Sequence, residues 1–197
     1  MTLSHRLARM TDIDALRALM GRAIGSLQNE FLSPDQVVAS SQVMGLDTQL
    51  VKDQTYFLVE ADHRIVGCGG WSWRATLFGG DNSMVAREPL PLDPATDAAK
   101  IRAMYTDPEF ARRGIGSRIL ELCEEAALEA GFAKVEMMAT LAGAALYRAR
   151  GYADVEPIQA TTPNGVSVPL IRMGKRLSSL VSIDQAIDPT GRHAPVE

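Results

Sequence analysis

The sequence predicts an α/β (α+β) domain, and three features support this: the composition, a strand–loop–helix unit in mid-chain, and strand pairs on either side of that unit. Hydrophobic residues make up 46% of the 197 residues and charged residues 22%, which is typical of a globular protein. This length is enough for one complete core. We therefore expect a single domain over residues 1–177, followed by a C-terminal tail over 178–197.

The first third of the chain predicts a strand and two helices. Alternation over Ser4 to Met10 predicts the strand, with Leu7 pointing inward. Apolar residues then recur every three or four positions over 12–28, which predicts an amphipathic helix. Ser33 and Pro34 form a helix start, because proline suits the first helical position, and this second helix should end near Gly45.

Residues 55–61 and 64–73 read as two strands joined by a tight turn. Glycines at positions 67, 69 and 70 predict a bulge or a close backbone approach in the second strand. Trp71 and Trp73 are two residues apart, so their side chains share one face of the strand. Packing on a helix is the favoured interpretation of this pair, and a wall of a substrate pocket is the alternative.

Residues 74–98 form the least regular segment, with two adjacent glycines and three prolines. A long irregular connection inside a domain is often functional, and a solvated surface excursion is an equally good interpretation. If the segment folds over a site, Arg74, Asp81 and Arg87 are its candidate substrate contacts.

The mid-chain unit begins with a strand over Lys100 to Thr106, which Pro108 ends because proline cannot donate to a β-ladder. A basic, glycine-bearing loop over 112–116 then opens a long helix whose end is marked by Gly131. The first amides of a helix lack internal partners and the helix dipole is positive there. The unit therefore predicts a site for an anionic ligand such as a phosphate.

Two better-known glycine motifs fit this loop less well. A dinucleotide-binding fingerprint needs a third glycine where the chain has Ile119, and a P-loop needs lysine where it has Ser117. An ordinary strand-to-helix turn remains the structural alternative for the loop considered alone.

After this unit the sequence predicts a strand over 133–139, a short helix over 141–150 and a β-hairpin. Thr140 is placed to cap the short helix. The hairpin strands cover 152–160 and 166–175, and the Asn164–Gly165 pair between them is a strong turn signal.

Two segments resemble landmarks of the GNAT acetyltransferases. Ala111 to Gly116 resembles the family's Arg/Gln-x-x-Gly-x-Gly/Ala loop, although Ala111 replaces the usual Arg or Gln. Ala144 to Tyr152 resembles the family's tyrosine-bearing helix followed by Gly-Phe/Tyr. The resemblance implies the GNAT fold, a mixed and mostly antiparallel sheet of about six to seven strands. That sheet is splayed between strands four and five and flanked by about four helices.

The resemblance further implies transfer of the acetyl group of acetyl-CoA to a primary amine by direct attack in a ternary complex. Tyr147 takes the place of the family's general acid, and the Tyr105 amide that of the donor to the reacting carbonyl oxygen, with its neighbours as alternatives. The coenzyme-binding residues implied by the resemblance are Met104, Tyr105, Thr106, Arg112, Arg113, Gly114, Ile115, Gly116, Ser117, Thr140 and Tyr147.

The resemblance places the acceptor cleft beside the two N-terminal helices, which makes Glu30 and Phe31 substrate-binding candidates together with Trp71 and Trp73. The general base stays open between Glu30, Asp107, Glu136 and a water chain. Arg148 and Arg150 are either contacts to the adenosine end of the coenzyme or solvated surface charges.

The totals restrict the partners. A net charge of −4 does not suggest a nucleic-acid partner, and no apolar run is long enough to span a membrane. Cys68 and Cys123 read as core residues of a cytoplasmic protein, with no metal-binding spacing. A small-molecule or protein amine is the expected substrate, and a homodimer is left open. The alternative functions are a non-catalytic acyl-CoA sensor of the same fold and an unrelated nucleotide-binding α/β protein.

Overall fold

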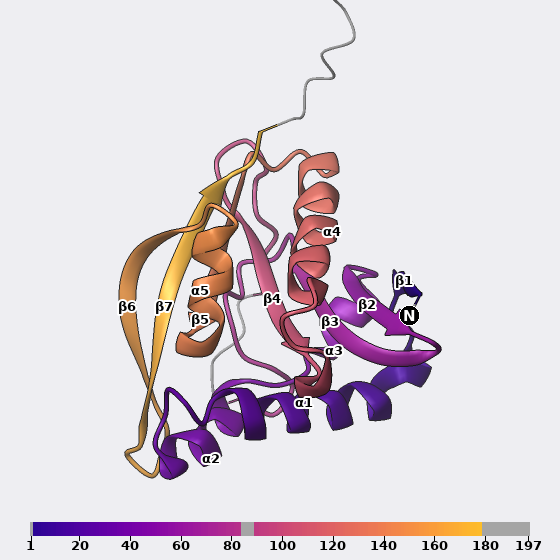
Figure 1. Ribbon diagram of the computed structural model, residues 1–197. Helices are drawn as coiled ribbons and strands as arrows, with labels where there is room; N and C mark the ends of the chain where they lie inside the picture. The colour runs from indigo at the N-terminus through magenta and orange to yellow at the C-terminus, as the bar shows by residue number, and fades with distance from the viewer. Residues whose placement is uncertain (1, 84–88, 179–197) are drawn as a thin grey trace, which may run out of the picture.

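The computed structural model describes residues 2–83 and 89–178 (Figure 1). Its strands are β1 (Leu3–Leu7), β2 (Tyr56–Ala61), β3 (Arg64–Ser72), β4 (Ala99–Thr106), β5 (Lys134–Thr140), β6 (Ala153–Thr161) and β7 (Ser167–Arg176). Its α-helices are α1 (Ile13–Leu27), α2 (Pro34–Val43), α3 (Thr48–Lys52), α4 (Ile115–Glu129) and α5 (Leu141–Ala149). Single 3₁₀ turns cover Met10–Asp12 and Pro108–Phe110.

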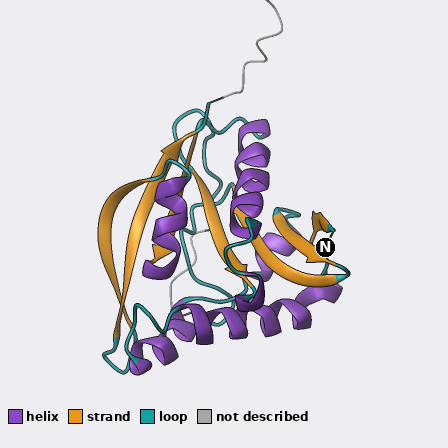
Figure 2. Cartoon of the chain, in the orientation of Figure 1, coloured by secondary structure: helices purple, strands orange, loops and turns teal. Residues whose placement is uncertain are grey.

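The strands form one seven-stranded sheet in the order β1-β2-β3-β4-β5-β7-β6. Every neighbouring pair is antiparallel except β4 and β5, which run parallel. This is the mixed, mostly antiparallel sheet that the family resemblance implies, with helices lying across it (Figure 2). The short helix α3 was not predicted.

Helices cover both faces of the sheet because side chains alternate along its strands. Val59 on β2 belongs to the core under α4, which also contains Ile119 from that helix. Leu58, one residue earlier, belongs to the core on the other face, together with Leu16 of α1. A third, smaller cluster joins α2 to β7. Figure 1 shows α4 and α5 side by side, with α1 crossing beyond their ends.

The glycines of β3 allow the predicted close approach, and it is α4 that approaches. A Cβ atom built on Gly69 would lie 2.6 Å from Cγ2 of Ile119, and one on Gly67 would overlap the side chain of Ile115. Side chains at these positions would push α4 off the sheet, so the glycines set the distance between the helix and the strand beneath its N-terminus.

Trp71 packs in the core, and Trp73, one residue beyond β3, is partly buried against it. Trp71 is buried with its ring edge-on to Phe132, at 6.1 Å between centroids. Trp73 packs against the same core, and the guanidinium of Arg74 lies 4.0 Å above the centre of its ring.

Two predictions near the N-terminus need correction. The first strand stops at Leu7 and does not reach Met10. Leu7 is 39% exposed, whereas Ala8 is buried. Leu7 therefore does not point inward. The strand ends at Leu7, and the first buried residue, Ala8, comes directly after it.

Two residues of the connection between β3 and β4, both predicted as substrate contacts, bind this connection to α3. Arg74 forms an ion pair with Asp53 at 2.7 Å. The Asp81 carboxylate accepts hydrogen bonds from the amide and hydroxyl groups of Thr48. Both side chains thus have partners within the protein, and contact with a substrate stays a prediction for them. Arg87 and the 179–197 tail lie outside the described residues.

Over the part of the chain that the structure describes, no helix combines the length and apolar character needed to cross a membrane.

Candidate functional site

The parallel pair β4–β5 separates partway along its length and leaves a wedge in the sheet. Pairing covers only Ala99 to Ile101 on β4 and Val135 to Met137 on β5. The remainder of both strands lines a cavity of about 980 Å³. The backbone edges that face this wedge have no partner strand across it, so they are available to a ligand.

One end of the cavity is closed by the N-terminus of α4. Gly114 is the N-cap, has a φ of +82° and offers no side-chain cap. The amides of Ile115, Gly116 and Ser117 therefore have no intrahelical acceptor, and all three residues line the cavity. A helix end of this kind favours an anion, because its amides and its dipole act in the same direction.

Gly116 also sets how closely α5 can approach α4. A Cβ atom built on Gly116 would lie 2.8 Å from Cδ2 of Leu146 on α5. A side chain at position 116 would force the Leu146 side chain to move, at the point where both helices border the wedge.

On the β4 side, a bulge at Ala103 shapes the wall. Ala103 has a φ of +50°, and the pairing register between β3 and β4 shifts there. The Asp107 amide donates to the Val66 carbonyl of β3 at 2.9 Å. Consecutive amides of an extended strand point to opposite sides, so the amides of Met104 and Thr106 are turned away from β3 towards the wedge.

The same alternation turns the Tyr105 amide towards β3, where its residue pairs with Cys68. This corrects the expectation that the Tyr105 amide is the donor to a reacting carbonyl. The Tyr105 side chain does line the cavity, and its hydroxyl accepts a hydrogen bond from the Gly45 amide at 3.0 Å.

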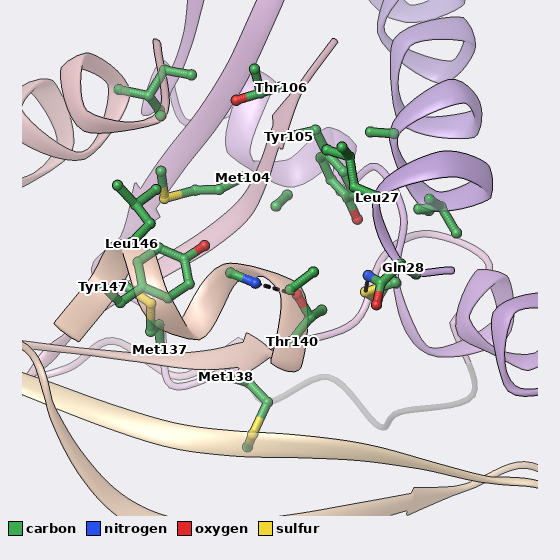
Figure 3. A pocket seen from close by; sticks show the side chains of 18 of the residues that line it. Leu27, Gln28, Met104, Tyr105, Thr106, Met137, Met138, Thr140, Leu146 and Tyr147 are labelled. Carbon is green, nitrogen blue, oxygen red and sulfur yellow. Dashed lines mark hydrogen bonds between the residues drawn. The ribbon is translucent and has the colours of Figure 1, made fainter. Parts of the chain in front are cut away.

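Tyr147 reaches the wedge from α5. Thr140 caps that helix as predicted, accepting from the Gly143 amide at 3.2 Å. The Tyr147 side chain is only 9% exposed, and its hydroxyl points into the cavity near Met104 and Leu146 (Figure 3). Burial raises the pKa of this phenol to about 12, because the charged phenolate is poorly solvated there. The hydroxyl therefore keeps its proton at neutral pH.

The profile of the Acetyltransferase (GNAT) family matches residues 24–152, a span that contains the wedge, the α4 N-terminus and Tyr147. The chain belongs to the GNAT acetyltransferase family. It is therefore an acetyl-CoA-dependent acetyltransferase, and the cavity suits that coenzyme. It offers unpaired amides for a diphosphate and free strand edges for an amide-bearing arm.

Solved structures share this GNAT fold at low sequence identity. A GCN5-related N-acetyltransferase from Rhodopseudomonas palustris is 17% identical, with a TM-score of 0.66, covering 90% of this chain and 97% of that one. The PaiA N-acetyltransferase from Thermoplasma acidophilum, solved in complex with coenzyme A, is 12% identical (TM-score 0.59; 90% and 100% covered). A ribosomal-protein-alanine N-acetyltransferase from Brucella melitensis is 18% identical (TM-score 0.59; 88% and 99% covered). Comparison with curated protein sequences gave no match.

The far half of the cavity in this GNAT protein lies between α1, α2 and the β3–β4 connection. The predicted residues Glu30 and Phe31 line it, whereas Trp71 and Trp73 do not. Its wall is mainly apolar and is formed by Ala23, Ile24, Leu27, Phe31, Val43, Met44, Leu77, Phe78, Met138 and Leu170. Of these, only Phe31 was predicted, because the others join the site through tertiary packing and carry no local signal.

Asp107, one of the three carboxylates left open as the general base, is held by arginines. It accepts hydrogen bonds from Arg22 and Arg64, both at 2.8 Å. Burial alone would raise its pKa, but these bonds and one from the Glu109 amide lower it. A buried carboxylate with this pKa is a poor base, and Asp107 does not line the cavity.

Glu136 is another carboxylate left open as the general base. It pairs with Lys100 and with Arg172, whose guanidinium nitrogen lies 2.6 Å from a Glu136 carboxylate oxygen. Burial opposes ionisation of Glu136, but the hydrogen bonds from both basic side chains lower its pKa. It joins β4, β5 and β7 and does not line the cavity. Of the three carboxylates left open by the sequence, Glu30 alone borders the cavity.

Most of the arginines near the coenzyme half have partners within the protein. Arg148 pairs with Asp154 at 2.6 Å, and Arg150 pairs with Glu121. The Arg113 guanidinium lies 5.1 Å above the Phe110 ring. None of the three lines the cavity, whereas Arg112 does. The surface-charge interpretation therefore fits Arg148 and Arg150 better than contact with the coenzyme.

Proposed function

We propose that this GNAT enzyme acetylates a primary amine by direct attack within a ternary complex. The observation that carries the proposal is the single cavity that runs from the α4 N-terminus through the wedge to the space between α1 and α2. Acetyl-CoA in the wedge and an amine in the far half would meet at the β4 bulge. Because the far half is open, the geometry gives no support to a sensor with a blocked acceptor cleft.

Direct attack is favoured over a covalent acetyl-enzyme, because the cavity has no suitable nucleophile. Within residues 2–83 and 89–178, neither a cysteine nor a histidine lines it. Cys68 and Cys123 are both buried in the core. Burial raises the pKa of the Cys68 thiol to about 12, so it is not a thiolate at neutral pH.

Three groups of the chain would act on the reactants. The amides of Ile115, Gly116 and Ser117 would hold the coenzyme diphosphate. The amides of Met104 and Thr106 face the wedge and would stabilise negative charge on the reacting carbonyl oxygen. The hydroxyl of Tyr147 would donate a hydrogen bond to the departing sulfur.

The reaction forms a nitrogen–carbon bond and breaks the carbon–sulfur bond, and one proton moves from the amine nitrogen to the departing thiolate. A phenol with a pKa of about 12 is a weaker acid than a thiol. Tyr147 would therefore stabilise the thiolate by hydrogen bonding until the proton of the amine arrives. Glu30 or a water chain would relay that proton. The cytoplasmic location and the homodimer stay predictions.

A charge placed at the helix terminus tests the coenzyme site. In Gly114→Asp the new carboxylate would repel the diphosphate, so we expect acetyl-CoA binding by isothermal titration calorimetry to be lost. Gly165→Asp is the matched control, because Gly165 has a φ of +81° and equally open surroundings but lies in the β6–β7 turn. Equal affinities of the two variants would exclude the α4 N-terminus as the diphosphate site.

A further inference from the structure

The acceptor half of the cavity has a mainly apolar wall, in which the Gln28 amide is a buried polar group. Met44, Phe78 and Met138 pack on the core cluster between α2 and β7 and also line the cavity. Leu27 and Phe31 complete the wall from the α1 side. Because Met44, Phe78 and Met138 continue from the core, this part of the wall is an apolar surface held in place by packing, whereas Phe31 is 47% exposed.

The charged groups of this half either form ion pairs within the protein or are exposed to solvent. Arg102 lines the cavity, but its guanidinium contacts the Asp47 carboxylate at 2.6 Å and the Gly79 carbonyl at 2.5 Å. Glu30 lies in the exposed loop after α1, where water screens its charge. Arg112 belongs to the opposite half, beside the α4 N-terminus. Among the described lining residues, Glu30 is the only carboxylate, and it is exposed to solvent.

Resting on the proposed amine acetylation, we propose that the acceptor is a primary amine with an uncharged, apolar body, such as an arylalkylamine or alkylamine. Phe31 and Phe78 are the side chains that select it. Its carbon skeleton would replace water against Phe78, Met44 and Leu27, while its amine faces the β4 bulge. A polyamine or an amino acid would have to bury a second charge against this wall, which is unfavourable without a partner.

The wall also disfavours a peptide acceptor. A peptide chain carries an N–H and a C=O group at each residue, and these groups need partners once they are buried. The apolar side chains of this half offer few such partners. Figure 3 shows Leu27 and Gln28 on the side of the cavity opposite Tyr147.

The test compares acceptors on the intact protein after acetyl-CoA binding has been measured by calorimetry. Initial rates of thiol release would be followed with phenethylamine, hexylamine, spermidine, L-lysine and a short peptide with an N-terminal alanine. The buried cysteines should give little background in this assay. We expect kcat/KM for phenethylamine and hexylamine to exceed the other values at least about tenfold.

Variants at Phe78 make the test specific to the wall. We expect Phe78→Ala to lower kcat/KM for phenethylamine about tenfold, and Phe78→Leu to restore most of it. Phe78→Asp should raise the spermidine-to-phenethylamine ratio more than tenfold. Leu90→Ala is the control, because Leu90 is 70% exposed, belongs to the same connection and does not line the cavity. Acetyl-CoA affinity should be unchanged in all four.

The outcomes separate the two proposals. Absence of acetyl-CoA binding to the unaltered protein would overturn the proposed function itself. Intact binding with the highest kcat/KM for spermidine, lysine or the peptide would overturn only the acceptor assignment. Intact binding without turnover of any apolar amine would do the same, and so would equal effects of Phe78→Ala and Leu90→Ala.

Discussion

The hydroxyl of Tyr56 donates a hydrogen bond of 2.6 Å to the carbonyl oxygen of Ala103, at the point where β4 bulges. Tyr56 is buried on β2, two strands away from the wedge. It holds a residue with positive φ in a conformation that a flat strand would not adopt. The bulge directly precedes Met104, so Tyr56 supports the cavity wall from within the core.

We expect Tyr56→Phe to lower the free energy of unfolding by about 1–2 kcal/mol, because the buried carbonyl loses this donor. We also expect a lower kcat, because the wall beside Met104 loses its support. Urea denaturation and initial rates would check both. A loss of stability with full activity would show that the bulge does not depend on this bond.

Removal of one hydroxyl tests the role proposed for Tyr147. We expect Tyr147→Phe to reduce kcat about 10²-fold and to leave the affinity for acetyl-CoA nearly unchanged. Tyr152→Phe is the control, since its ring lies 6.0 Å from that of Tyr147 but does not line the cavity. Equal activity of the two variants would remove Tyr147 from the mechanism.

The raised pKa of Tyr147 predicts in which direction kcat/KM changes with pH. Burial disfavours the phenolate, so the proton needed for hydrogen bonding stays in place up to about pH 11. Raising the pH also deprotonates the attacking amine, so we expect kcat/KM to rise between about pH 6 and 9 with no falling limb below about pH 10. A falling limb there that disappears in Tyr147→Phe would contradict the raised pKa.

Gly143 makes room for the Tyr147 ring one helical turn away. A Cβ atom at position 143 would lie 2.8 Å from Cε2 of Tyr147 and 3.3 Å from its hydroxyl oxygen. We expect Gly143→Ala to displace the ring and reduce kcat at least about tenfold, as a misplaced catalytic group does. Gly21→Ala is the control within a helix, since nothing lies within 4 Å of its Cβ position. Gly21→Ala should retain activity and gain about 0.5–1 kcal/mol of stability.

An unchanged kcat in Gly143→Ala would show that the position of the Tyr147 ring is not critical.

Gln28 contains a buried acceptor without a donor. It is 6% exposed and lines the cavity, and its Nε2 donates to Sδ of Met44 at 3.7 Å. Its Oε1 has no hydrogen-bond partner in the described protein. We expect Gln28→Met to keep or raise the free energy of unfolding, by up to about 1 kcal/mol. We also expect a KM for the amine several times higher, because a bound N–H is then no longer accepted. Lower stability with an unchanged KM would make Gln28 structural.

Local patterns account for much of the architecture. The α4 unit was placed to within about two residues, because a proline turn, a glycine loop and a one-sided apolar stripe all lie within thirty residues. The turn of the β6–β7 hairpin follows in the same way from Asn164 and Gly165. By contrast, the short helix α3 was missed, since five residues show almost no periodicity. The general base was left open between Glu30, Asp107, Glu136 and a water chain, because the arginine and lysine partners of Asp107 and Glu136 come from distant strands and helices.

Turn chemistry and periodicity act over a few residues, so local patterns alone indicated most of the elements, the helix end that can hold an anion and a helix that carries Tyr147, whose role came from the family resemblance. Long-range packing was needed to show which strand amides face the wedge and which carboxylates are already paired. It also decided that the acceptor wall is apolar. Those properties depend on the bulge at Ala103 and on side chains from α1, α2, β5 and β7, which meet only after the chain has packed.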